Sequence, residues 1–342
     1  MSTKFNIAIA GATGNVGREI IQILEDKDFP VDQLYLLASS RSKGQAIEFR
    51  GEELIVEDLA EFDFSKVHIG LFSPGGKVSA EFAPKAAKAG CIVIDNTSYF
   101  RMKKDIPLIV PEVNPEDINL AKKKIISNPN CSTIQMVVAL KPIHDLFKIK
   151  KIIVATYQST SGAGKDAMDE LFHQTLNVYK NKPLKSEIFT KRIAFNLIPH
   201  IDEFLESCFT KEENKMIEET NKIFKDNIDI FATCVRVPVF VGHGEAVYLE
   251  TEKNINLKKI IEKLKDFNGL SLVDKPIDGG YVTPDESAGE DDVFVSRLRM
   301  GLSSKKSLGL WIVADNLRKG AALNTVQIAE LLVKKLKKDE KF

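Results

Sequence analysis

The sequence lacks an excess of charge of either sign, since its 342 residues include 48 Lys and Arg and 48 Asp and Glu. Such a chain carries no overall field that favours nucleic acid or an anionic membrane. It also lacks an apolar run of the ~20 residues that span a bilayer. The apolar segment 5–10 is too short for a secretory signal. We therefore expect a cytoplasmic protein that binds neither nucleic acid nor membrane.

Cysteine is scarce as well, and its four copies, Cys91, Cys131, Cys208 and Cys234, are scattered without metal-ligand spacing. This excludes a sequence-encoded metal motif and predicts free thiols in a reducing compartment. Hydrophobic residues at 44% and charged residues at 28% are typical of a globular protein. The length exceeds the usual size of one hydrophobic core, which favours two domains.

Among these cysteines, Cys131 has the most informative setting. It follows the turn Asn128-Pro129-Asn130 and precedes the apolar, helix-length run 134–140. The pattern predicts a thiol at a helix N-terminus, where unpaired N–H groups and the helix dipole favour the thiolate. A thiolate is a nucleophile, although most free cysteines are simply small buried hydrophobic residues.

The first part of the chain has the pattern of a nucleotide-binding fold. A buried strand over 5–10 runs into Gly11-Ala12-Thr13-Gly14-Asn15-Val16-Gly17, and residues 18–26 have the spacing of an amphipathic helix. Glycines in this context permit a tight turn and close approach to a pyrophosphate at the helix N-terminus. Further strands over 34–38, 67–72 and 91–94, with a helix over 79–89, predict a doubly wound, mostly parallel sheet.

The end of the second strand indicates which dinucleotide binds. An NAD site expects an acidic residue there, about 20 residues past the glycines. This chain instead has Ser39-Ser40-Arg41-Ser42-Lys43, whose hydroxyls and cations suit a 2′-phosphate. The sequence therefore favours NADP over NAD, the alternative being an exposed polar loop.

Beyond residue 148 the pattern changes to longer alternating strands over 152–158, 233–241, 246–251 and 292–300, with helices over 165–179 and 211–224. These predict an α+β domain with a mostly antiparallel sheet. Gln158 precedes a loop of small residues, and Arg236 and His243 flank the strand expected over 237–241. The glycines on both sides of His243 favour an exposed ring that is free to approach a ligand. The last helix, expected over 323–336, is predicted to pack back on the first domain.

Several of these motifs, in order along the whole chain, resemble aspartate-semialdehyde dehydrogenases of the bacterial type. They are the glycine loop 11–17, Asp95-Asn96-Thr97-Ser98, Asn128–Thr133, Gln158–Gly164, the segment from Arg236 to His243, and Asp315–Ala322. The resemblance implies an NADP-binding domain over 1–130 and 319–342, and a catalytic and dimerisation domain over 131–318. It also implies a homodimer without a metal.

The implied activity is the reversible NADPH-dependent reduction of aspartyl phosphate to aspartate semialdehyde, through a cysteine thioester, on the route to lysine, methionine, threonine and diaminopimelate. Cys131 would be the nucleophile, His243 the acid–base residue and Gln158 the residue that orients the substrate. Arg236 would bind the substrate carboxylate and Glu212 its amine, while Arg101 and Lys215 would hold phosphate. NADP would contact Gly11, Thr13, Gly14, Asn15, Val16, Arg41, Ser42, Ser161, Gly162 and Asn316. Without the resemblance, Glu212 and Lys215 would be interpreted as an exposed helix face.

Three alternatives remain open from the residues. An N-acetyl-glutamyl-phosphate reductase would be expected to carry glycine and then tyrosine around the cysteine, where this chain has Asn130 and Ser132. A glyceraldehyde-phosphate-type dehydrogenase would favour Ser-Cys-Thr-Thr and an acidic residue for NAD. An NADP-binding sensor would bind the cofactor without turnover, and would not need the whole set of Cys131, Gln158, Arg236 and His243.

Overall fold

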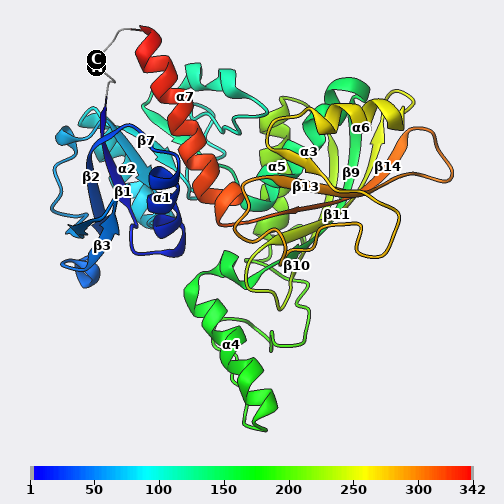
Figure 1. The fold of residues 1–342 in the computed structure, drawn as a ribbon, viewed down its shortest axis with the longest axis horizontal. Coiled ribbons are helices and arrows are strands. Elements are labelled where there is room, and N and C mark those ends of the chain that lie inside the picture. The colour runs from blue at the N-terminus through cyan, green and yellow to red at the C-terminus, as the bar shows by residue number, and fades with distance from the viewer. Residues whose placement is uncertain (1–3, 340–342) are drawn as a thin grey trace. The chain divides into compact units, whose positions relative to one another are not determined.

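The computed structural model describes residues 4–339, which form two compact units (Figure 1). Unit 1 extends to Pro129 and resumes at Ala321, and unit 2 comprises Asn130–Gly320. Within residues 4–339, no helix is both long enough and apolar enough to cross a membrane.

Unit 1 contains a six-stranded sheet whose neighbouring strands all run parallel, in the order β5-β2-β1-β6-β7-β8. The chain winds from β1 outward to β2 on one side and then to β6 on the other, which is the doubly wound topology. The strands are β1 (Phe5–Ala10), β2 (Val31–Ala38), β5 (Glu57–Asp58), β6 (Ile69–Phe72), β7 (Ile92–Asp95) and β8 (Ile125–Ser127). A separate hairpin joins β3 (Ala46–Phe49) to β4 (Glu52–Ile55).

Both faces of this sheet are covered, because alternate side chains of β1 enter two different apolar clusters. Ile7 and Ile9 pack in a cluster that includes α1 (Asn15–Asp26) and α7 (Leu323–Asp339). Ala8 and Ala10 pack in the other, with α2 (Gly76–Lys88). The C-terminal helix is therefore part of the core of unit 1.

Unit 2 contains a second six-stranded sheet, in the order β10-β9-β11-β14-β13-β12. Its central pairs are antiparallel and the pair at each edge is parallel. The strands are β9 (Ile149–Gln158), β10 (Asp229–Arg236), β11 (His243–Thr251), β12 (Leu270–Leu272), β13 (Val293–Met300) and β14 (Ser307–Ala314). The expected mostly antiparallel sheet is confirmed, with parallel edges that the sequence pattern did not reveal.

One face of this second sheet is covered by helices and the other is not (Figure 1). The covering helices are α3 (Cys131–Phe147), α5 (Lys211–Phe224) and α6 (Leu257–Lys265). Residues 132–140 of α3 are buried all round, as expected for a helix packed inside a domain. A fourth helix, α4 (Lys165–Tyr179), extends away from the sheet of unit 2.

One expected strand is wrong in its second half. The alternating pattern predicted a strand over 233–241, but β10 ends at Arg236 and β11 begins at His243. Pro238 has no N–H to donate to a ladder, and Gly242 has a φ of +93°, so the chain turns between them. Arg236 and His243 therefore lie at the ends of two different strands and do not flank one.

Candidate functional site

The thiol of Cys131 lies at the first residue of α3, as predicted. Asn130 is the N-cap, and its side-chain oxygen accepts hydrogen bonds from the N–H groups of Ser132 at 3.0 Å and Thr133 at 3.3 Å. Cys131 is partly exposed, whereas Cys91 and Cys234 are buried in apolar surroundings. Burial raises the pKa of Cys91 to about 12 and also raises that of Cys234, so neither is a nucleophile near neutral pH.

A buried carboxylate lies beside the nucleophile's helix cap. Glu212 Oε1 accepts hydrogen bonds from Asn130 Nδ2 at 2.8 Å and from Gln158 Nε2 at 3.1 Å, and its Oε2 is 3.1 Å from Lys215 Nζ. Burial opposes ionisation of Glu212, but the Lys215 charge and these hydrogen bonds outweigh it and lower the pKa to about 2. Glu212 is therefore a fixed negative charge. The exposed helix face that the motif alone would suggest is not what the structure has, because Glu212 is buried where α5 packs against α3.

Lys215, one helical turn further along α5, is half-buried and paired with two carboxylates. Its Nζ lies 2.7 Å from Asp202 Oδ2 as well as 3.1 Å from Glu212 Oε2. Desolvation opposes the charge of Lys215, but Glu212 and Asp202 raise its pKa. A phosphate that binds Lys215 would have to share this cation with them.

Arg236 and His243 form the other side of the site. Arg236 Nη1 donates to the carbonyl of Ser159 at 2.6 Å, and the side chains of Arg236 and His243 are both buried. A Cβ on Gly162 would lie 3.1 Å from Arg236 Nη1 and 3.3 Å from His243 Nε2, so this glycine leaves space in front of both. Desolvation and the Arg236 charge lower the pKa of His243 to about 3, although Glu212 acts in the opposite direction.

The expectation of an exposed His243 is wrong, since its ring has no exposed surface. As the first residue of β11 it pairs with Ala314, and it shares a face with Glu245, Val247 and Leu249, which are all buried. Ser159 and Asn316 hold that ring: Ser159 N–H donates to His243 Nδ1 at 3.1 Å, and Ser159 Oγ donates to Asn316 Oδ1 at 2.9 Å. Ser161 Oγ also lies 3.1 Å from Asn316 Oδ1, so these two predicted NADP contacts bond to each other.

Three further residues belong to this site and were not identified from the sequence. Gln135, one turn after Cys131 on α3, donates to the His243 carbonyl at 3.2 Å. Glu245 is fully buried two residues after His243, and burial raises its pKa well above the usual range. A Cβ on Gly320 would lie 2.7 Å from Cys131 Cβ. The strand period places Glu245 on the inner face with His243, which is the one signal that could have revealed it.

The remaining predicted residues lie in unit 1. Gly11 has a φ of +85°, and a Cβ there would lie 2.6 Å from the Ser73 carbonyl oxygen. A Cβ on Gly17 would lie 2.2 Å from the Gly11 oxygen. Gly14 is the N-cap of α1 and offers no side-chain cap, so the helix N-terminus is open to an anion. These positions fit the turn, close approach and packing that a dinucleotide loop needs.

The other predicted residues of unit 1 are also near strand ends. Arg41 and Ser42 form a short 3₁₀ turn, Ser40–Ser42, after β2, with Arg41 exposed. Arg101 is buried in the loop after β7, where Nη2 donates to the Asn96 carbonyl at 2.9 Å. Thr13, Asn15 and Val16 lie at the turn into α1, partly exposed.

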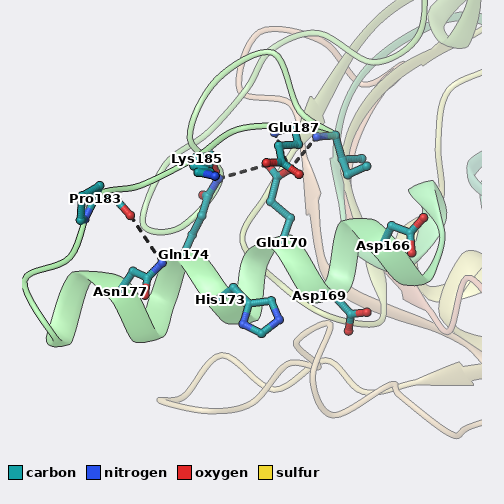
Figure 2. A pocket seen from close by; sticks show the side chains of 10 residues that line it. Asp166, Asp169, Glu170, His173, Gln174, Asn177, Pro183, Lys185 and Glu187 are labelled. Atoms are coloured by element: carbon teal, nitrogen blue, oxygen red, sulfur yellow. Dashed lines mark hydrogen bonds between the residues drawn. The ribbon is translucent and has the colours of Figure 1, made fainter.

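A separate pocket of about 500 Å³ lies along α4 and is not a candidate site. Figure 2 shows Glu170 directed at the backbone near Glu187, where it accepts N–H groups of Glu187 at 2.8 Å and Ile188 at 2.6 Å. Its polar groups thus hold a loop on the helix. Among residues 4–339, no group of three or more His, Cys, Asp or Glu is arranged to hold a metal ion.

Comparison with known proteins identifies the family to which the chain belongs. The family "Semialdehyde dehydrogenase, dimerisation domain" matches residues 140–319, and "Semialdehyde dehydrogenase, NAD binding domain" matches residues 6–121. Aspartate-semialdehyde dehydrogenase 2 of Vibrio cholerae serotype O1 is 52% identical over 339 residues, which cover 98% of this chain and 99% of the relative. The enzyme of Aquifex aeolicus is 53% identical over 334 residues, covering 96% and 98%. The chain belongs to the aspartate-semialdehyde dehydrogenase family.

Solved structures of that family have the same fold. The crystal structure of aspartate semialdehyde dehydrogenase II from Vibrio cholerae matches with a TM-score of 0.95 at 52% identity, over 97% of this chain and 99% of that one. A second Vibrio cholerae structure, complexed with ASA, also has a TM-score of 0.95, at 51% identity over 97% and 99%. Membership in the aspartate-semialdehyde dehydrogenase family decides against the two alternative enzymes, an N-acetyl-glutamyl-phosphate reductase and a glyceraldehyde-phosphate-type dehydrogenase.

Proposed function

We propose that this chain reduces aspartyl phosphate to aspartate semialdehyde through a thioester on Cys131, with NADPH as the reductant. One observation carries the proposal: the end of one sheet gathers a partly exposed thiol at a helix N-terminus, a fixed carboxylate and a buried guanidinium. These are the groups needed to hold an amino acid by its two charged ends beside a nucleophile. The product serves the biosynthesis of lysine, methionine, threonine and diaminopimelate.

The charges at this end of the sheet match the substrate. Arg236 stays protonated at neutral pH and presents a fork that suits the α-carboxylate. Glu212, with its lowered pKa, stays ionised and suits the ammonium group. Gln158 is assigned the orientation of the carbonyl, and its hydrogen bonds of 3.1 Å to Glu212 and 2.9 Å to Thr156 support this role. Arg101 and Lys215 are the cations assigned to the phosphate.

The dinucleotide is assigned to the loop 11–17 with its open α1 N-terminus and to Arg41 and Ser42, whose charge and hydroxyl suit a 2′-phosphate. Ser161, Gly162 and Asn316 are the assigned contacts from unit 2. NADPH, when bound, supplies a hydride. The chain's own residues hold the acyl group, balance its charge and exclude water from it.

The reaction balances on Cys131. Its thiolate adds to the acyl carbon, the phosphate oxygen leaves with the electron pair of the broken C–O bond, and inorganic phosphate takes a proton from solvent. The acyl group is then held as a thioester. Reduction of that carbon places an electron pair on the carbonyl oxygen, and collapse of the alkoxide expels the Cys131 thiolate and releases the aldehyde.

We propose that the enzyme is a homodimer that uses the face of the unit 2 sheet opposite helices α3, α5 and α6. Ile153, Phe231 and Tyr248 lie side by side there on three adjacent strands and are 41%, 54% and 36% exposed. A row of exposed large apolar side chains marks a protein interface, and the matching family segment is described as a dimerisation domain. Phe231→Asp is expected to convert a dimer to a monomer in light scattering. An unchanged mass would contradict this interface.

The activity is tested by following NADPH absorbance with aspartate semialdehyde, NADP⁺ and inorganic phosphate. A signal that requires phosphate and is lost in Cys131→Ala supports the proposal, with Cys208→Ala as the matched control for an exposed cysteine outside the site. Activity without phosphate, or full activity in Cys131→Ala, would refute it. A preference for NAD⁺ would refute only the roles given to Arg41 and Ser42. The four free cysteines fit a reducing compartment, and we place the enzyme in the cytoplasm.

A further inference from the structure

Lys215, the cation assigned to the phosphate, lies between two carboxylates. Its Nζ is 2.7 Å from Asp202 Oδ2 and 3.1 Å from Glu212 Oε2. Burial opposes all three charges, but the contacts outweigh it, since they lower the pKa of both carboxyl groups and raise the pKa of the ammonium. At neutral pH the cluster therefore carries one excess negative charge, which opposes the binding of an anion at Lys215.

The two carboxylates are held to different degrees. The Glu212 side chain is 7% exposed and also accepts hydrogen bonds from Asn130 Nδ2 at 2.8 Å and Gln158 Nε2 at 3.1 Å. The Asp202 side chain is 32% exposed, and its second oxygen accepts from the Glu203 N–H at 2.9 Å. A carboxylate near the surface regains water when its ion pair opens, whereas a buried one is left uncompensated. Asp202 is therefore the partner that can release the ammonium at the lower cost.

The segment that carries Asp202 is anchored on both sides of this residue. Ile198 exchanges backbone hydrogen bonds of 3.0 and 2.8 Å with Arg236, and the Glu203 carbonyl accepts from the Lys211 N–H at 2.8 Å. Asp202 itself has a φ of +69°, in the left-handed region that Asp tolerates better than most residues. Because the backbone is fixed in this way, rotation of the side chain alone opens the ion pair.

We propose that Asp202 is a counter-ion that competes with phosphate for Lys215, so that it weakens phosphate binding and speeds phosphate release. The inference rests on the proposed function, in which Lys215 holds the phosphate. When a phosphate group arrives, its oxygens replace the Asp202 carboxylate at Nζ, and when phosphate leaves, Asp202 pairs with the ammonium again. Inorganic phosphate is a product of the reductive direction, so a contact that is easily reversed favours turnover.

Phosphate binding is measured without turnover, by titrating inorganic phosphate with the full-length, NADP⁺-loaded protein and following the ³¹P line width. Asp202→Asn removes the charge, keeps an oxygen that can accept from the Glu203 N–H, and suits the left-handed backbone. Removing one partly buried negative charge beside Lys215 is expected to tighten phosphate binding roughly tenfold. Unchanged or weaker binding would overturn the inference, because Asp202 would then not compete with phosphate.

Glu203, the next residue, provides the matched control. Its exposed carboxylate pairs with Lys211, on the same helix as Lys215. Glu203→Gln removes the same charge from the same segment without touching Lys215, so phosphate binding should change by about twofold or less, as for an exposed ion pair. An equal gain in Glu203→Gln and Asp202→Asn would assign the effect to the overall charge of the segment and would overturn direct competition.

Steady-state kinetics separate competition from a loss of structure. In the phosphorylating direction, Asp202→Asn is expected to lower the KM for phosphate roughly tenfold, with the KM for aspartate semialdehyde little changed. In the reductive direction, inorganic phosphate should inhibit this variant at correspondingly lower concentrations. A raised KM for phosphate would refute the inference. If Asp202→Asn does not fold, Asp202→Gly also suits a φ of +69° and carries the same predictions.

Lys215→Met separates a failure of this inference from a failure of the proposed function. The variant keeps an apolar stem and lacks the charge, so it is expected to weaken phosphate binding at least roughly tenfold. Asp202→Asn should then bring no gain in the double variant. A gain that persists in the double variant would overturn only the competition for Lys215. Unchanged phosphate binding in Lys215→Met would instead remove Lys215 from the phosphate site, and the proposed function would lose that assignment as well.

Discussion

Replacing Gly320 with alanine should disable the site by moving its nucleophile. The new Cβ would lie 2.7 Å from Cys131 Cβ and 3.2 Å from Cys131 Cα, whereas non-bonded carbons are at ease at ~3.5–4.0 Å. The overlap is therefore about 1 Å, and the atoms that must move are the nucleophile's own Cβ and the first turn of α3. Neither of these two Cys131 atoms is the far end of a flexible side chain that could rotate away from the new methyl group.

Overpacking of this kind costs about 1–3 kcal/mol of stability, and a 1 Å displacement of a reacting group costs ~10²-fold in rate. We expect Gly320→Ala to remain folded, to lose about two orders of magnitude in kcat and to lose 1–3 kcal/mol in urea unfolding. Gly76→Ala is the matched control, because a Cβ there meets nothing within 4 Å. Wild-type kcat in Gly320→Ala would show that Cys131 is not held by this contact.

Three further predictions concern groups around the same site. The pKa of Glu212 is about 2 in the folded protein and 4.5 in the unfolded chain, so its ionisation stabilises the fold by up to about 3 kcal/mol. This stabilisation is present above pH 4.5 and is lost as the pH falls toward 2. In urea unfolding, the stability of Glu212→Gln should not show this loss. The raised pKa of Glu245 makes ionisation cost stability as pH rises above 4.5, so Glu245→Gln should be more stable than wild type at pH 8 in the same assay. Gly162→Ala places a methyl group 3.1 Å from Arg236 Nη1 and 3.3 Å from His243 Nε2. In the NADPH assay this variant should show a KM raised, or a kcat lowered, at least roughly tenfold. An unaltered kcat/KM would show that substrate does not use the space beside these two groups.

Elements with strong local signals could be predicted from the sequence almost to the residue. α5 begins at Lys211 because Thr210 and Glu213 form a capping box, and its end at Phe224 was also predicted. The start of α3 at Cys131 follows from Asn130, whose short polar side chain caps the helix. In each case the determining contacts lie within four residues, where a sequence pattern can report them.

Features set by distant contacts could not be predicted in this way. The glycines beside His243 suggested an exposed ring, but the pairing of β11 with β14 and β9 directs that ring inward. Glu212 lies on a helix whose composition is polar, and only its packing against α3 buries it. Period-two alternation predicted a strand over 237–241, because it does not register the missing N–H of Pro238.

Four of the buried polar atoms that lack hydrogen-bond partners among residues 4–339 belong to His243, Glu245 and Gln135. Leaving such an atom buried costs about 1–3 kcal/mol, which must be relieved either by substrate or by a proton. A Cβ on Gly162 would lie 3.3 Å from His243 Nε2, so the absent side chain leaves space beside that nitrogen. Both oxygens of Glu245 and the Oε1 of Gln135 are likewise buried without hydrogen-bond partners in this part of the chain. Because the pKa of Glu245 is raised, one of its oxygens can carry a proton and donate it to Gln135 Oε1, which gives these two atoms a partner and keeps negative charge away from His243.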